Sequence, residues 1–99
     1  MNKRIENANM ELLVDCFLAL KDREEAQDFF EDLCTIKELQ DISQRLEVAQ
    51  LLMEKKKYQE IASVTGASTA TISRVNRALM YGNNSYEPII RRISGKAEV

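Results

Sequence analysis

The chain has 99 residues, which is enough for one small domain. Hydrophobic residues make up 44% and charged residues 30% of it, a composition too apolar for a disordered segment. Only three Gly and one Pro interrupt it, so helices are favoured over a turn-rich sandwich or barrel. His is absent, which removes the commonest general base and neutral metal ligand. The formal net charge of −2 argues at first sight against a nucleic-acid binder.

The cysteines and the apolar segments favour a cytoplasmic protein. Cys16 and Cys34 are far apart and outside any C-x-x-C spacing, which argues against a zinc site, and we expect both thiols to stay reduced. Residues 12–20 are apolar, but this stretch is short and contains Asp15, so it does not predict a secretory signal. No stretch approaches the roughly 20 apolar residues that cross a bilayer. We therefore expect no membrane partner.

The charges are unevenly distributed along the chain. Residues 1–41 contain eleven acidic and five basic residues, a balance of −6, whereas residues 42–99 contain five acidic and nine basic residues, a balance of +4. A local positive face is therefore compatible with the acidic total. An ordinary mixed surface accounts for the same counts, so charge alone leaves both interpretations open.

Apolar residues recur at spacings of three and four over residues 5–21 and 23–33, which predicts two amphipathic helices. Their apolar stripes consist of Ile5, Leu13, Cys16, Phe17 and Leu20, and of Ala26, Phe29, Phe30 and Leu33. Thr35 and Glu38 have the spacing of a capping box, which predicts the start of a third helix. This helix extends to about Lys55, and we expect its inward face to contain Leu39, Ile42, Leu46, Ala49 and Met53.

Residues 58–81 have the pattern of a helix-turn-helix. Ala62 provides a small residue where two short helices approach each other, and Gly66 provides a permissive turn. Ser68 or Thr69 then caps a second helix that runs to about Tyr81. Its inward residues are Ile72, Val75 and Leu79. Residues 84–94 contain a turn and a last short helix, in which Pro88 must lie in the first turn.

In a helix-turn-helix, the N-terminal end of the second helix enters the major groove of DNA. Hydroxyls there can bond bases, phosphates or water, and small side chains let the backbone approach the base edges. A polar loop and helix cap is the alternative interpretation of this segment, and the lysines before it also complement the dipole of the third helix. The predicted DNA-binding residues are Lys55, Lys56, Lys57, Tyr58, Gln59, Ser68, Thr69, Ala70, Thr71, Ser73, Arg74 and Arg77.

With these residues identified, residues 32–81 resemble the Trp repressor family, in particular the Trp-repressor-like proteins of Gram-positive bacteria. The resemblance rests on residues 33–35, on Arg45, and on residues 66–74, Gly-Ala-Ser-Thr-Ala-Thr-Ile-Ser-Arg. It implies an all-α fold of about six helices and an intertwined homodimer. Residues 1–99 would form a single domain, with residues 1–55 as dimerisation helices, and the two reading helices would enter successive major grooves of double-stranded DNA.

The resemblance also implies a candidate corepressor pocket formed by Thr35, Arg45 and Arg74, because tryptophan binds between two arginines in the family's founding member. Two departures disfavour tryptophan here: Val75 replaces a glycine and Ala78 replaces a serine. Gln59 and Ala62 likewise replace basic residues that face DNA, so the founding member's operator is not expected. No resident cofactor or metal is expected, and a different corepressor or none remains open.

The sequence thus predicts a sequence-specific DNA-binding transcriptional regulator, with repression as the expected direction. The alternative is a helical protein–protein interaction module that has lost specific DNA binding, which the acidic N-terminal part favours. An enzyme is not expected, because no nucleophile–base pair, phosphate loop or metal cluster can be assembled from these residues.

Overall fold

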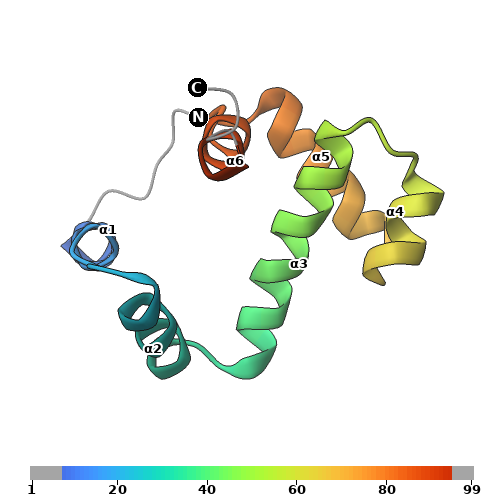
Figure 1. Cartoon of the computed structure of the whole chain (residues 1–99). Helices are drawn as coiled ribbons and strands as arrows, with labels where there is room; N and C mark the ends of the chain where they lie inside the picture. The colour runs from blue at the N-terminus through green and yellow to red at the C-terminus, as the bar shows by residue number, and fades with distance from the viewer. Residues whose placement is uncertain (1–7, 95–99) are drawn as a thin grey trace. The chain divides into compact units, whose positions relative to one another are not determined.

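A computed structural model describes residues 8–94, and within them the chain forms six α-helices without strands (Figure 1). The chain divides into two compact units, Met1–Leu39 and Gln40–Val99. None of the described helices is long and apolar enough to span a membrane. The helices are α1 (Ala8–Leu18), α2 (Arg23–Leu33), α3 (Ile36–Met53), α4 (Tyr58–Thr65), α5 (Thr69–Tyr81) and α6 (Tyr86–Ser94).

The first unit contains α1 and α2, and α1 is shorter than predicted at its C-terminal end. It ends at Leu18 instead of residue 21, because the chain must turn before the extended N-cap residue Asp22 begins α2. The carboxylate of Asp22 accepts a hydrogen bond from the amide of Glu25 at 2.9 Å, and Glu25 Oε1 accepts one from the amide of Lys21 at 2.9 Å. Both bonds satisfy amides that an α-helix leaves unpaired. Ile5 lies outside the described residues.

An aromatic cluster joins α1 to α2. The ring of Phe17 lies with its centroid 6.2 Å from that of Phe29 and 5.5 Å from that of Phe30. Such edge and tilted arrangements stabilise aromatic pairs beyond the area that they bury. No described residue of this unit is buried, however.

The predicted capping box at the start of α3 is confirmed. The hydroxyl of Thr35 accepts a hydrogen bond from the amide of Glu38 at 3.0 Å, and Glu38 Oε1 accepts one from the amide of Thr35 at 2.9 Å. The helix ends at Met53, before the predicted Lys55. Lys55 has a left-handed backbone with φ of 68°, and the amide of Lys56 donates to the carbonyl of Leu51 at 3.1 Å. These two features end a helix as a glycine would.

The second unit contains the hydrophobic core. Its buried residues come from α3, from α4 and the turn after it, and from α5 and α6: Val48, Ala49, Ile61, Ala67, Ile72, Val75 and Ile90. Leu79 and Tyr86 are partly buried and pack against this core. The predicted inward residues Ile72 and Val75 of α5 are therefore confirmed, and Pro88 lies in the first turn of α6 as predicted.

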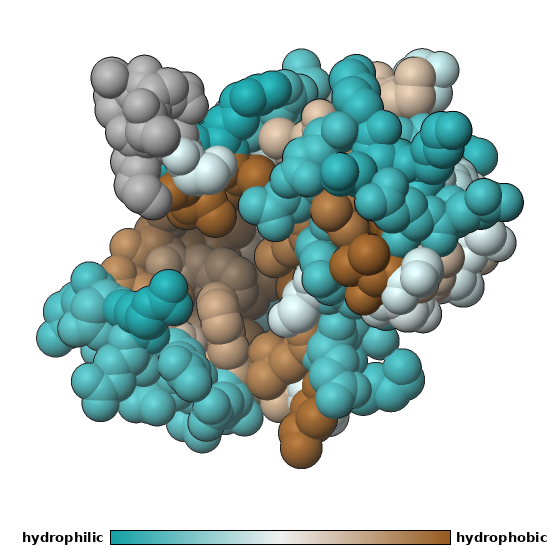
Figure 2. Space-filling view, turned by 45° about the vertical axis from the view of Figure 1, so that its right-hand side comes forward, coloured by the Kyte–Doolittle hydropathy of each residue, from teal (hydrophilic) through white to brown (hydrophobic). Residues whose placement is uncertain are grey.

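The predicted inward face of α3 is only partly correct. Ala49 is buried, but Ile42 and Leu46 are each 46% exposed, and the buried neighbour of Ala49 is Val48. A helix with apolar residues on more than one face can cover a core with either face. Figure 2 shows hydrophobic residues, in brown, at the surface of the chain beside hydrophilic ones.

Candidate nucleic-acid interface

Two short helices and a tight turn form the scaffold of the candidate interface. The turn residue Gly66 has φ of 77°, and its amide donates to the carbonyl of Ala62 at 2.9 Å. This left-handed conformation suits glycine, which has no Cβ to clash with the following peptide. Ile61 on α4 and Ile72 on α5 are both fully buried. The predicted helix-turn-helix is thus present at residues 58–81.

Ser68 is the N-cap of α5. This result decides between Ser68 and Thr69, the two predicted N-cap residues. The hydroxyl oxygen of Ser68 accepts a hydrogen bond from the amide of Thr71 and donates one to Thr71 Oγ1, each at 3.1 Å. Its own hydrogen is thus engaged within the helix. Thr69 and Ala70 lie between these two residues and are exposed. The hydroxyl of Thr69 is therefore the one of the three best placed to meet an external partner.

The residues predicted to contact DNA are almost all at the surface. Thr71 is half-buried, and the other eleven are exposed: Lys55, Lys56, Lys57, Tyr58, Gln59, Ser68, Thr69, Ala70, Ser73, Arg74 and Arg77. On α5, exposed Ser73, Arg74 and Arg77 alternate with buried Ile72 and Val75. The same helix therefore holds the core with one side and presents cations and hydroxyls with the other.

The three lysines form the connection between α3 and α4, not the last turn of α3. Lys57 is the N-cap of α4, with an extended backbone and without a side-chain cap. Its carbonyl accepts the first helical hydrogen bond, from the amide of Ile61 at 2.9 Å. The three ammonium groups thus lie just before the helix-turn-helix on an exposed segment.

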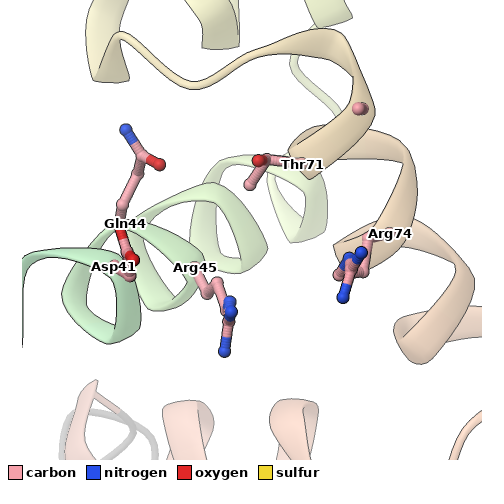
Figure 3. Close-up of a pocket in the computed structure, with 6 residues that line it drawn as sticks. Asp41, Gln44, Arg45, Thr71 and Arg74 are labelled. Atoms are coloured by element: carbon pink, nitrogen blue, oxygen red, sulfur yellow. The ribbon is translucent and has the colours of Figure 1, made fainter. Parts of the chain in front are cut away.

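Arg45 on α3 and Arg74 on α5 line one surface cavity of about 240 Å³ (Figure 3). In this view both guanidinium groups extend toward the same side of their helices, while Gln44 points away from them. The remaining lining residues are Asp41, Gln44, Ala70 and Thr71. Thr35, the third predicted pocket residue, belongs to the first unit, where it caps α3.

The residues that line this cavity are mostly polar or charged. Only Ala70 among the lining residues is apolar, so an indole would find little apolar surface. Val75, which replaces the glycine of the founding member, is 1% exposed, packs in the core and does not line this cavity. The two guanidinium groups could bind an anionic group, whereas the carboxylate of Asp41 in the same lining would repel one.

The sequence did not predict a tertiary contact for Gln44. Its amide Nε2 donates to the carbonyl of Thr65, 21 residues further along the chain, at 3.2 Å. No local sequence pattern predicts this contact, because it depends on how α3 packs against α4. Within residues 8–94, no group of three or more His, Cys, Asp or Glu side chains is placed to hold a metal ion.

The comparisons with known proteins extend the resemblance over most of the chain. The family model described as Trp repressor protein matches residues 8–94. The uncharacterized protein YerC of Bacillus subtilis (strain 168) is 50% identical over 90 residues, which cover 91% of this chain and 86% of that protein.

Two crystal structures are similar in both sequence and fold. A TrpR-like protein from Eubacterium eligens is 52% identical with a TM-score of 0.87, over 91% of this chain and 93% of that chain. A candidate Trp repressor from Staphylococcus aureus is 46% identical, also with a TM-score of 0.87, over 91% and 90%. The chain therefore belongs to the Trp repressor family, a family of DNA-binding regulators and not of enzymes.

Proposed function

We propose that the chain is a sequence-specific DNA-binding transcriptional regulator that acts as a repressor in the cytoplasm. The observation that carries this proposal is the exposed N-terminal end of α5, which stands on a buried apolar scaffold. Thr69, Ala70 and Ser73 are small and exposed there, so the helix backbone can approach base edges in the major groove.

The proposed interface divides its residues between two tasks. Thr69 and Ser73 can hydrogen-bond base edges, and Ala70 can contact the methyl group of a thymine. Gln59 on α4 can pair with N6 and N7 of an adenine. The exposed cations before α4 and on α5 would bind phosphates, which positions the protein without specifying a sequence. These cations are Lys55, Lys56, Lys57, Arg74 and Arg77.

We further propose that residues 1–55 dimerise the chain into a single domain with its partner copy. Residues 9–33, whose burial the structure describes, contain no buried residue in α1 or α2, and Leu12 and Leu18 on α1 are 64% and 78% exposed. Large apolar side chains gathered on one exposed helix indicate an association surface. Two copies would also supply two reading helices, which compensates for the few cations of one protomer.

The cavity between Arg45 and Arg74 is the candidate effector pocket of this regulator. Its polar lining and two guanidinium groups favour a small anionic effector over an indole. Arg74 is also exposed on the DNA-facing side of α5, so a bound anion would withdraw a cation from the phosphates. No resident cofactor belongs to the proposal.

The proposal is tested by selecting duplexes from random-sequence DNA with the purified full chain and measuring the affinity of the selected duplex. We expect enrichment of one sequence pattern and a gel shift that weakens steeply with salt. A matched pair of variants locates the interface: Arg77→Ala should weaken binding, whereas Arg92→Ala on α6 should not. Equal losses for both variants, or no enriched sequence, would refute the proposal.

An interaction module without specific DNA binding is the second candidate function. The exposed apolar residues of α1 and the acidic balance of residues 1–41 favour it. Under this alternative, Leu18→Glu would abolish capture of a stoichiometric protein partner while selection on random DNA enriched no sequence.

A further inference from the structure

A side-chain hydrogen bond connects α3 to the end of α4, just before the turn of the helix-turn-helix. Gln44 on α3 is half-buried, and its Nε2 donates to the carbonyl of Thr65 at 3.2 Å. Thr65 is the last residue of α4 and directly precedes Gly66. The bond therefore joins the long helix to the residue before the turn.

The carbonyl of Thr65 is one that an α-helix leaves without a partner. The carbonyls at the end of a helix lack intrahelical partners, and the amide of Gly66, the first beyond α4, donates to the carbonyl of Ala62 and not to that of Thr65. A half-buried carbonyl without a partner costs free energy, so the Gln44 amide stabilises this end of α4.

The side chain of Thr65 fixes the turn on its other side. Its hydroxyl donates to the carbonyl of Ile61 at 2.7 Å and accepts from the amide of Ala67 at 3.0 Å. Ala67 is buried, and the next residue, Ser68, caps α5. A continuous series of hydrogen bonds thus leads from Gln44 through Thr65 to the residue that precedes the start of α5.

Apolar packing sets the angle between helices only approximately. The hydrophobic effect is non-directional, and packing of helix ridges into grooves leaves crossing angles a scatter of about 15–20°. A hydrogen bond is directional and weakens steeply when its angle opens. The Gln44 amide therefore adds a directional restraint between α3 and the end of α4 to the packing of Val48 and Ile61.

We propose that Gln44 is a positioning residue for DNA recognition: its bond to the Thr65 carbonyl holds the turn so that α5 presents its N-terminal end at one fixed angle. The inference rests on the proposed DNA binding and adds a determinant of specificity that does not itself touch DNA. Base contacts need this angle, because hydrogen bonds to base edges tolerate little misalignment. Phosphate contacts by flexible lysine side chains do not need it.

The test compares Gln44→Met with Gln50→Met in the full chain. Methionine preserves the length and helix propensity of glutamine but has no amide to donate. Gln50 is an exposed residue of the same helix, which makes it the matched control. Affinities are measured for the duplex that the wild-type chain selects from random DNA and for a scrambled duplex of equal length, at one salt concentration.

We expect Gln44→Met to weaken binding of the selected duplex about fivefold, the central value for one hydrogen bond, and to leave the scrambled duplex within about twofold. Gln50→Met should change neither affinity by more than about twofold. Equal losses on both duplexes would show that Gln44 only stabilises the fold, and an unchanged selected affinity would overturn the proposal.

Amide hydrogen exchange on the free protein separates this proposal from the proposed function. Loss of the Gln44 bond should accelerate exchange at the amides of Gly66 and Ala67 at least about fivefold, while Val75 in the core should change less. Unchanged exchange at Gly66 and Ala67 would overturn the positioning role even if DNA binding is specific. Failure of the wild-type chain to select any duplex would instead refute the proposed function, together with the role in specificity.

Discussion

Gly66 and Gly82 end their helices for different physical reasons, and this difference gives a sharp prediction. Gly66 has φ of 77°, but a Cβ built on it meets no atom within 4 Å. Gly82 has an ordinary φ of −86°, but a Cβ built on it would lie 2.5 Å from the carbonyl oxygen of Ala78. Glycine is thus required at position 66 by the backbone conformation, and at position 82 because there is no room for a Cβ.

The cost of Gly66→Ala follows from the backbone alone. A left-handed conformation costs an L-residue about 1–2 kcal/mol. Alanine also reduces the conformational entropy of the unfolded chain, which stabilises the folded state by about 0.4–1 kcal/mol. The net loss is about 1 kcal/mol, which corresponds to a decrease in Tm of about 4–8 °C for a chain of this size. Gly66→Asn should lose less, because Asn tolerates this conformation.

Gly82→Ala should cost more, about 1–3 kcal/mol, because backbone atoms must move to relieve the contact. Gly82→Asn should not recover the loss, since Asn carries the same Cβ. Urea unfolding of the four variants, at one protein concentration because of the proposed dimer, measures these differences. A neutral Gly66→Ala, or a Gly82→Asn as stable as the wild-type chain, would refute the reasoning.

Four further predictions concern DNA binding, assembly and ligand binding. Arg77→Ala should weaken binding of selected and scrambled duplexes alike, and it should make the slope of log affinity against log salt shallower by about 0.9 for each phosphate that is no longer neutralised. Thr69→Ala should instead change the base preference in a repeated selection. An unchanged preference would exclude Thr69 from base recognition. Leu18→Glu should convert a dimer to monomers in sedimentation equilibrium, because a carboxylate cannot be buried cheaply in an apolar interface; a mass equal to that of the wild-type chain would contradict the role of α1. Titration of the chain with tryptophan should give no saturable heat in calorimetry. If tryptophan binds with a Kd of about 1 μM or tighter and Arg45→Ala abolishes this binding, the polar cavity does accept an indole.

Local signals in the sequence predicted much of the fold. The capping box of Thr35 and Glu38 and the left-handed Gly66 each depend on residues within a few positions, so both could be predicted and both are confirmed. The alternation of buried Ile72 and Val75 with exposed Arg74 and Arg77 follows directly from helical periodicity.

The features that the sequence did not predict depend on tertiary packing or on unusual backbone conformations. Lys55, two residues after the end of α3, has a positive φ that lysine seldom adopts. The apolar periodicity therefore predicted a helix that is too long at its C-terminal end. Ile42 and Leu46 match the apolar period of α3 but are largely exposed, and Val48, which that period does not include, covers the core beside the predicted Ala49. The bond from Gln44 to Thr65 spans 21 residues and has no local signature.

Binding of a specific DNA sequence by α4, its turn and α5 is tested most directly by the salt dependence of binding to the selected duplex. Each protomer offers five cations around this motif, Lys55, Lys56, Lys57, Arg74 and Arg77. A dimer that uses most of its ten cations predicts a plot of log affinity against log salt with a slope between about −5 and −9, and a scrambled duplex should bind far more weakly. A slope near zero, or equal affinity for both duplexes, would contradict sequence-specific binding by this motif.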